Sequence, residues 1–171
     1  MLVLQGNMHR SKTADDLLEQ IVLEKEADIV LISEQYCKQK DGTWITDPSN
    51  TAAIWVPKNK NLSIKEKGSG HGFVWIKVRN IIFVSCYLTP SDSIENFNRK
   101  LNEIEDTLRD KNNIIVGGDF NSKAVEWGSN STNSRGGRIM DMAARIGLSV
   151  ANIGKTPTFR RPGCQGTILG F

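Results

Sequence analysis

The sequence has no long apolar stretch. Its longest apolar runs, IIFVSCYL and DIVLIS, are far shorter than the roughly 20 residues that a membrane-spanning helix needs. The opening MLVLQGN has no basic segment before it and no small-residue cleavage site after it, so it predicts a strand and not a signal peptide. We therefore expect a soluble protein that is not secreted.

Cysteine and histidine are scarce. The three cysteines, Cys37, Cys86 and Cys164, show no CxxC or Cys/His spacing, which favours free thiols in a reducing compartment over a disulfide framework or a zinc site. The nucleus or the cytoplasm is the expected location. Of the two histidines, His71 lies in the turn GSGHG, which favours exposure, and neither it nor His9 is a convincing general base.

A strong excess of charge is also missing. The net charge of +3 and the pI of 8.8 allow a polyanionic partner without requiring one, because phosphate binding depends on local clusters of charge. No internal repeat and no linker interrupts the 171 residues, so the sequence predicts one domain over residues 1–171 with one core.

Short apolar segments alternate with amphipathic ones along the chain. Helices are predicted from about residue 13, where Thr13 and Asp16 resemble a capping box, over 93–111 and over 135–148. Strands are predicted at 2–7, 28–33, 51–57, 62–67, 72–78, 81–88, 113–118, 148–153, 157–161 and 166–171, with a loop at 38–50. The strands between residues 51 and 88 should be antiparallel, and the class is α/β or α+β with a sheet-rich core.

Two carboxylates directly follow apolar strands. Glu34 ends DIVLIS and Asp119 ends NIIVGG, and strand ends are where α/β folds gather their reactive groups. Mg²⁺ takes oxygen ligands, usually one or two carboxylates completed by water and substrate phosphate. Glu34 together with the amide of Asn7 is therefore a candidate site for such an ion.

The stretch GGDFN places two polar side chains on one face of a strand end. Strand alternation sends Phe120 to the opposite face, into the core, and leaves Asp119 and Asn121 together. Asp119 can then orient or deprotonate an attacking water while Asn121 donates to a phosphate oxygen. Gly117 and Gly118 indicate either a bend or the close approach of another backbone.

Each of these signals alone also has a simpler interpretation. A strand that ends in Gly-Asp is commonly a turn, Glu34 alone is a solvated residue after a strand, and Asn7 alone is a turn residue. Tyr87 ends its strand just before Pro90, where its hydroxyl can reach the same site, although a strand tyrosine usually packs and makes one hydrogen bond.

A series of motifs gives the chain a family resemblance. QGNMHR, ADIVLISE, SCYLTP and GDFN, in this order, resemble the endonuclease/exonuclease/phosphatase superfamily, which includes pancreatic deoxyribonuclease and the apurinic endonucleases. GDFNSKAVEWGS and the following SRGGRIMDMAARIGLSVANIGKTPTFRR resemble, more specifically, the apurinic-type endonuclease domain of non-LTR retrotransposons, which nicks chromosomal DNA for target-primed reverse transcription. The resemblance covers nearly the whole chain.

The resemblance implies a four-layer α/β sandwich of two mainly antiparallel sheets flanked by helices, with one Mg²⁺ or Mn²⁺ at the strand ends and double-stranded DNA as substrate. Position by position, it assigns metal binding to Glu34 with Asn7 as support, the water to Asp119, the scissile phosphate to Asn121 and transition-state stabilisation to Tyr87. Loops facing DNA would contain Arg10, Ser122, Trp127 and Arg135. A reverse transcriptase domain is expected in the intact element.

Two departures from the family pattern lie near the end of the chain. Where the family has a Ser/Thr-x-x-Asp strand, this sequence has Thr167, Ile168, Leu169 and Gly170, and the chain stops at Phe171 without the family's final Ser-Asp-His. The resemblance therefore implies a C-terminally incomplete domain that lacks its last strands and has impaired activity.

Three functions stay open at the level of the sequence. The leading one is a Mg²⁺-dependent DNA endonuclease that leaves a 3′-hydroxyl. The second is a phosphatase of the same superfamily acting on a phosphorylated lipid or nucleotide, against which the WGS and RGGR stretches argue. The third is a catalytically silent remnant that binds nucleic acid or has no function.

Overall fold

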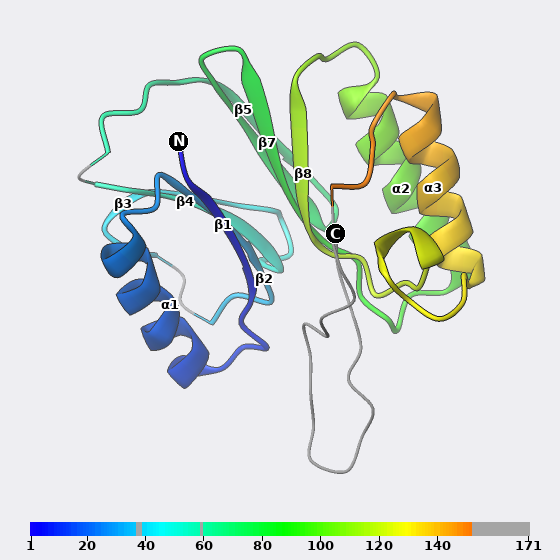
Figure 1. Cartoon of the computed structure of the whole chain (residues 1–171), viewed down its shortest axis with the longest axis horizontal. Helices are drawn as coiled ribbons and strands as arrows, with labels where there is room; N and C mark the ends of the chain where they lie inside the picture. Colours follow the sequence, from blue (N-terminus) through cyan, green and yellow to red (C-terminus); the bar gives the residue numbers. More distant parts are fainter. Residues whose placement is uncertain (37–38, 59, 152–171) are drawn as a thin grey trace. The chain divides into compact units, whose positions relative to one another are not determined.

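The computed structural model describes residues 1–36, 39–58 and 60–151 (Figure 1). The chain divides into two compact units. The first unit comprises Met1–Tyr87 and Lys111–Gly118, and the second comprises Leu88–Asp110 and the described residues from Asp119 onward. The expectation of one domain over residues 1–171 stays a prediction. Within the described ranges, no helix combines the length and the hydropathy needed to cross a bilayer.

The first unit contains two four-stranded sheets. One has the order β1 (Val3–Asn7), β2 (Ile29–Ser33), β4 (Ala52–Pro57), β3 (Gly42–Thr46), and only β1 and β2 in it are parallel. The other has the order β5 (Ile64–Gly70), β6 (Phe73–Val78), β7 (Ile81–Tyr87), β8 (Ile114–Asp119). The pairs β5–β6 and β6–β7 are antiparallel, as predicted for this stretch of the chain.

The last pair, β7 with β8, is parallel. Ile82 N donates to Asn113 O over 2.9 Å, and Leu88 N donates to Asp119 O over the same distance. The two partners advance together along the chain, which is the pattern of parallel strands. Each sheet is therefore mixed and carries one parallel pair.

Strand alternation builds the core of the first unit. All positions of β2 are buried, with Ile29 and Leu31 in the cluster between the two sheets and Val30 and Ile32 in the cluster under α1 (Lys12–Lys25). A strand that is apolar on both faces needs cover on both faces, which here comes from a sheet and a helix. Figure 1 shows α1 beside the first sheet.

The second unit contains α2 (Ile94–Leu108), the short 3₁₀ helix η1 (Val125–Trp127) and α3 (Ser134–Arg145). The apolar spacing of α2 predicted its buried face correctly, because Phe97, Leu101, Ile104 and Leu108 are all buried, whereas Ile94 is exposed at the first turn. The two long helices lie side by side and are joined by Arg145, whose guanidinium donates to both Glu105 oxygens over 2.9 and 2.7 Å.

Three sequence predictions about local structure were wrong. The expected loop at 38–50 contains β3, because the β-formers Thr43 to Thr46 pair with β4 between flanking turn residues. The cap of α1 is Ser11, which accepts from Ala14 N over 3.4 Å, and not a Thr13–Asp16 capping box. Residues 148–151 form no strand.

Several predictions fall on residues outside the described part of the chain. They are the remainder of the strand expected at 148–153, the strands expected at 157–161 and 166–171, the thiols of Cys37 and Cys164, and the departure at Thr167 to Gly170 with the chain end at Phe171.

Candidate active site

Asn7 and Glu34 stand next to each other because their strands are parallel. Asn7 is the last residue of β1 and pairs with Ser33, the last residue of β2, so Glu34 follows directly beside it. The Asn7 Nδ2 donates to Glu34 Oε1 over 3.1 Å. The Glu34 side chain keeps 20% of its surface exposed, so its carboxylate is held on one side and open on another.

The backbone around this pair is strained. His9, Arg10 and Glu34 have φ angles of 47°, 52° and 49°, in the left-handed region that non-glycine residues seldom adopt. Glu34 N donates to Thr51 O over 2.8 Å, and Arg10 N donates to Glu34 O over 2.9 Å. Such conformations persist only where the surroundings hold them, and they cluster at functional sites.

His9 is a neighbour of Glu34 that the sequence analysis did not select. Its Nδ1 lies 3.6 Å from Glu34 Oε1, and its backbone N–H donates to Asn7 Oδ1 over 2.9 Å. The available signal was its place two residues after Asn7, at the same strand end. His71, by contrast, is exposed as predicted.

Tyr87 lies at the C-terminal end of β7, in the other sheet of the same unit. Its side chain is buried in the cluster between the sheets. Ser33 Oγ donates to Cys86 O over 2.8 Å, which ties the residue before Glu34 to the residue before Tyr87. The two strand ends that carry these candidate residues are therefore fastened to each other across the sandwich.

The residue before Tyr87 carries a buried thiol, which strand alternation places on the opposite face of β7 from the cluster between the sheets. Cys86 is fully buried, and burial raises the pKa of its thiol well above the ordinary value, with a smaller contribution from the Asp47 charge. Of the cysteines that the structure describes, Cys86 is a free thiol, as the sequence predicted, and it is unreactive in the folded state.

Asp119 and Asn121 form a second pair, in the second unit. Asn121 N donates to Asp119 Oδ1 over 2.9 Å, and Asn121 Nδ2 donates to Leu88 O over 3.2 Å. Asn121 has a φ of 46°, in the left-handed region that non-glycine residues seldom adopt. Phe120 is buried, as the alternation of GGDFN predicted.

Gly118 allows the close approach of another backbone. Its φ is +153°, and an added Cβ would lie 2.1 Å from Cys86 O on β7. An added Cβ on Gly117 would lie 2.9 Å from Leu31 Cδ1. The predicted close approach is thus confirmed, and the strand partner is β7.

The residues assigned to DNA-facing loops differ in their surroundings. Arg10 is exposed, whereas Ser122 and Trp127 are buried. Arg135 lies in the first turn of α3, where its guanidinium donates to the carbonyls of Thr89 (2.9 Å), Pro90 (3.2 Å) and Asp92, and stacks over Phe97. Arg135 therefore fastens the loop after Leu88 to α3, and DNA contact stays a prediction best suited to Arg10.

The Asn7–Glu34 pair suits a weakly held hard cation. Among the described residues, no group of three or more His, Cys, Asp or Glu side chains forms a metal cluster. One partly exposed carboxylate with an amide beside it is a sparse oxygen set, which is typical of Mg²⁺ sites that rely on water and substrate phosphate. Asn7 Oδ1 already accepts from His9 N, so Asn7 supports Glu34 more readily than it binds an ion.

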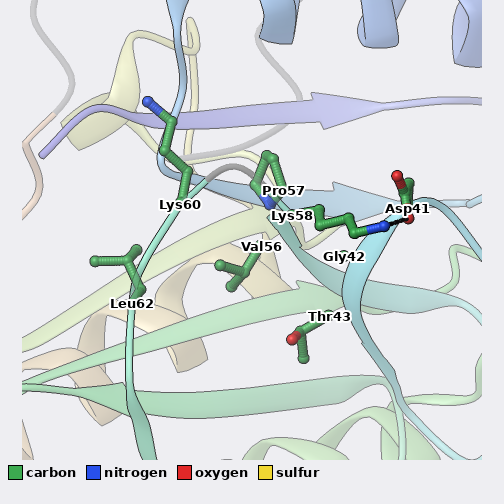
Figure 2. A pocket seen from close by; sticks show the side chains of 8 residues that line it. All are labelled: Asp41, Gly42, Thr43, Val56, Pro57, Lys58, Lys60 and Leu62. Atoms are coloured by element: carbon green, nitrogen blue, oxygen red, sulfur yellow. Dashed lines mark ion pairs between the residues drawn. The ribbon is translucent and has the colours of Figure 1, made fainter.

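The pocket in Figure 2 is separate from this site. It has a volume of about 330 Å³ and is lined by Asp41, Gly42, Thr43, Val56, Pro57, Lys58, Lys60 and Leu62. It lies where Gly42 pairs with Pro57, at the opposite end of β4 from Ala52, which pairs with Ser33. Its ion pair between Lys58 and Asp41 is exposed, with 3.7 Å between the charged atoms.

Two mixed sheets with strained, polar strand ends define an α/β fold of the nuclease type, and comparison with known proteins agrees. The chain belongs to the endonuclease-reverse transcriptase family, whose sequence profile matches residues 81–169. It is similar to the solved endonuclease domain of TRAS1, a telomere-specific non-LTR retrotransposon, with 29% identity and a TM-score of 0.79 over 98% of this chain and 81% of that one. The predicted family and fold class are confirmed.

A more distant structure shares the fold alone. The 3′-5′ exonuclease (NExo) from Neisseria meningitidis matches with 10% identity and a TM-score of 0.58, over 85% of this chain and 71% of that one. A search of curated proteins found no match to the sequence.

Proposed function

We propose that the chain is a DNA endonuclease domain of a non-LTR retrotransposon that depends on Mg²⁺ or Mn²⁺. The observation that carries the proposal is the Asn7–Glu34 pair, with its 3.1 Å hydrogen bond, on a fold similar to that of the TRAS1 endonuclease domain. A partly exposed carboxylate steadied by an amide is what a weakly bound hard cation requires.

The proposed reaction is hydrolysis of one phosphodiester of double-stranded DNA. Glu34, supported by Asn7, would hold the cation, which when bound neutralises charge on the phosphate. Asp119 takes a proton from the attacking water as the new oxygen–phosphorus bond forms. The bond between phosphorus and the 3′ oxygen breaks, and the 3′ oxygen takes a proton from solvent water to leave as a hydroxyl. The phosphate stays on the 5′ oxygen of the next nucleotide.

The remaining candidate residues stabilise charge. Asn121 has an amide group that can donate to a phosphate oxygen, and Tyr87 has a hydroxyl for the charge that develops in the transition state. The 3′-hydroxyl would serve a reverse transcriptase of the same element as its primer, and a chromosomal substrate would place the activity in the nucleus.

Nicking of supercoiled plasmid tests the proposal. We expect Mg²⁺-dependent formation of open circles whose 3′ ends a DNA polymerase extends. Glu34→Gln and Asp119→Asn should each lower the rate by at least about a hundredfold, the usual contribution of a proton-transfer or charge-stabilising group. Glu24→Gln, an exposed change on α1, should leave the rate unchanged.

Three results would contradict the proposal. Nicking that survives both substitutions would place the chemistry elsewhere. Release of phosphate from phosphomonoesters without nicking would indicate a phosphatase of the same superfamily. A gel shift with DNA, again without nicking, would indicate a chain that binds nucleic acid but does not cut it.

A further inference from the structure

Asp47 is a buried carboxylate that the proposed reaction does not use. It lies between β3 and β4 with 1% of its surface exposed. Its Oδ1 accepts from Thr51 N (2.6 Å) and Ala52 N (2.8 Å), and its Oδ2 accepts from Ser49 N (3.0 Å), Thr51 Oγ1 (3.2 Å) and Gly72 N (3.3 Å). One side chain thus holds a turn of the first sheet and a turn of the second.

Each of these turns accepts a backbone hydrogen bond from a candidate catalytic residue. Thr51, held through its N–H and hydroxyl, accepts from Glu34 N at its carbonyl over 2.8 Å. Gly72, held through its N–H, accepts from Tyr87 N at its carbonyl over 2.8 Å. Asp47 is therefore linked by hydrogen bonds to Glu34 through a single residue, Thr51, and to Tyr87 through a single residue, Gly72.

Glu34 depends on such support more than an ordinary strand residue does. Its φ of 49° lies in the left-handed region, which is unfavourable for a residue with a side chain. The bond from Glu34 N to Thr51 O is one of the two backbone bonds that hold it there, the other being from Arg10 N to Glu34 O. A shift of Thr51 would therefore move Glu34 directly.

We propose that Asp47 is a positioning residue that sets Glu34 and Tyr87 relative to each other by fixing the turns at Thr51 and Gly72. The effect of Asp47 on catalysis rests on the proposed function. Its effect on the positions of Glu34 and Tyr87 does not, because it concerns the chain without metal. An asparagine at this position keeps one acceptor oxygen and replaces the other with a donor, which opposes the N–H groups that Oδ2 now accepts from.

The test compares Asp47→Asn with Val56→Ala in the full chain. Val56 is buried in the cluster between the sheets, at the opposite end of β4, so its truncation lowers stability without touching either turn. Three readouts are needed, at a temperature where both variants are folded: the amide NMR signals of Glu34 and Tyr87 without metal, the Mn²⁺ affinity from paramagnetic broadening, and kcat and KM for nicking.

For Asp47→Asn we expect shifted amide signals at both Glu34 and Tyr87, Mn²⁺ affinity about tenfold weaker, and kcat reduced by about ten- to a hundredfold with KM little changed. Val56→Ala should move none of these readouts, whatever its melting temperature. If Asp47→Asn lowers the melting temperature but leaves both amide signals and the Mn²⁺ affinity as in the unmodified chain, Asp47 is structural only and the proposal is wrong.

Two further arms keep the result unambiguous. If Asp47→Asn does not fold, Thr51→Val removes only the hydroxyl bond to Asp47 Oδ2, and it should shift the Glu34 amide while sparing that of Tyr87. An unshifted Glu34 amide in that variant would overturn the proposal. If the unmodified chain does not nick DNA but Asp47→Asn still moves both amides, the positioning inference stands and the proposed function fails.

Discussion

Lys40 Nζ lies 2.6 Å from Asp15 Oδ2, and both side chains are buried, with 1% and 6% of their surfaces exposed. The same ammonium group lies 2.7 Å from Glu19 Oε1. Both acids are on α1, whereas Lys40 belongs to the segment between Glu34 and β3. These two ion pairs therefore hold Lys40, which follows Glu34 in the sequence, against α1.

Replacing Lys40 should destabilise the chain strongly. Lys40→Met leaves the Asp15 carboxylate buried without its cation, and loss of one partner of a buried pair costs roughly 3 kcal/mol of the free energy of unfolding. Urea denaturation at neutral pH measures it. Lys58→Met, which breaks the exposed pair with Asp41, is the matched control and should change the free energy by less than about 0.5 kcal/mol.

The contribution of Lys40 should disappear at high pH. Burial alone lowers the pKa of Lys40, but its hydrogen bonds to Asp15 and Glu19 outweigh burial and raise the pKa above the ordinary 10.5. A raised pKa in the folded state gives stability that is complete below 10.5 and is lost as the pH rises through the folded value. The free energies of unfolding of the unmodified chain and of Lys40→Met should therefore converge above the folded-state pKa of Lys40. A difference between them that stays constant with pH would contradict a role for the Lys40 charge.

Asn7→Ala should weaken metal binding without unfolding the chain. It removes the amide that donates to Glu34 Oε1, and loss of such a supporting partner typically lowers metal affinity about ten- to a hundredfold. Paramagnetic broadening during a Mn²⁺ titration measures the affinity. Asn61→Ala, an exposed change in the same unit, should have no effect. Equal affinities in the two variants would show that Asn7 does not support the ion.

The two glycines of RGGR should respond oppositely to alanine. An added Cβ on Gly136 would lie 1.9 Å from Lys123 O, so Gly136→Ala should cost about 2–3 kcal/mol of unfolding free energy. An added Cβ on Gly137 meets nothing within 4 Å, so Gly137→Ala should stabilise α3 by about 0.5–1 kcal/mol. Denaturant titration of both variants checks the difference, and two equal effects would refute it.

The pair between α2 and α3 should weaken in acid. The hydrogen bonds from Arg145, followed by those from Arg109, hold the pKa of Glu105 below the ordinary 4.5 against the opposing effect of burial. A lowered pKa gives stability that is present above 4.5 and is lost as the pH falls through the folded value. Glu105→Gln should thus be less stable than the unmodified chain at neutral pH and should approach it in strong acid. A difference in unfolding free energy that persists at low pH would indicate that Glu105 stabilises the chain through packing and not through its charge.

Local patterns in the sequence predicted the strands and the buried faces well. The continuous apolar run of β2 and the spacing of Phe97, Leu101 and Ile104 each specify burial through neighbours in the chain. The motif order indicated the family and, through it, the fold, which the comparisons confirm. The parallel pairing of β1 and β2 then brings Asn7 to Glu34, as a strand-end site requires.

The residues that the sequence did not reveal act across long separations. Asp47 occurs in the turn-forming stretch Asp-Pro-Ser-Asn, and its bond to Gly72 N joins residues that are 25 positions apart. Arg135 looked like a loop residue, but its acceptors Thr89 and Pro90 lie 46 and 45 positions earlier. Composition and periodicity describe only near neighbours, so such cross-linking bonds are visible only in the folded chain.

The buried thiol of Cys86 makes the chain a reporter of its own opening. Since Cys86 is fully buried on β7, an alkylating reagent reaches its sulfur only when the packing around this strand opens. The labelling rate of the peptide that contains Cys86, followed by mass spectrometry, therefore measures how often the packing around β7 opens. The same rate can be measured with and without DNA or Mn²⁺, so an effect of either ligand on this opening becomes measurable in a chain that carries no dye.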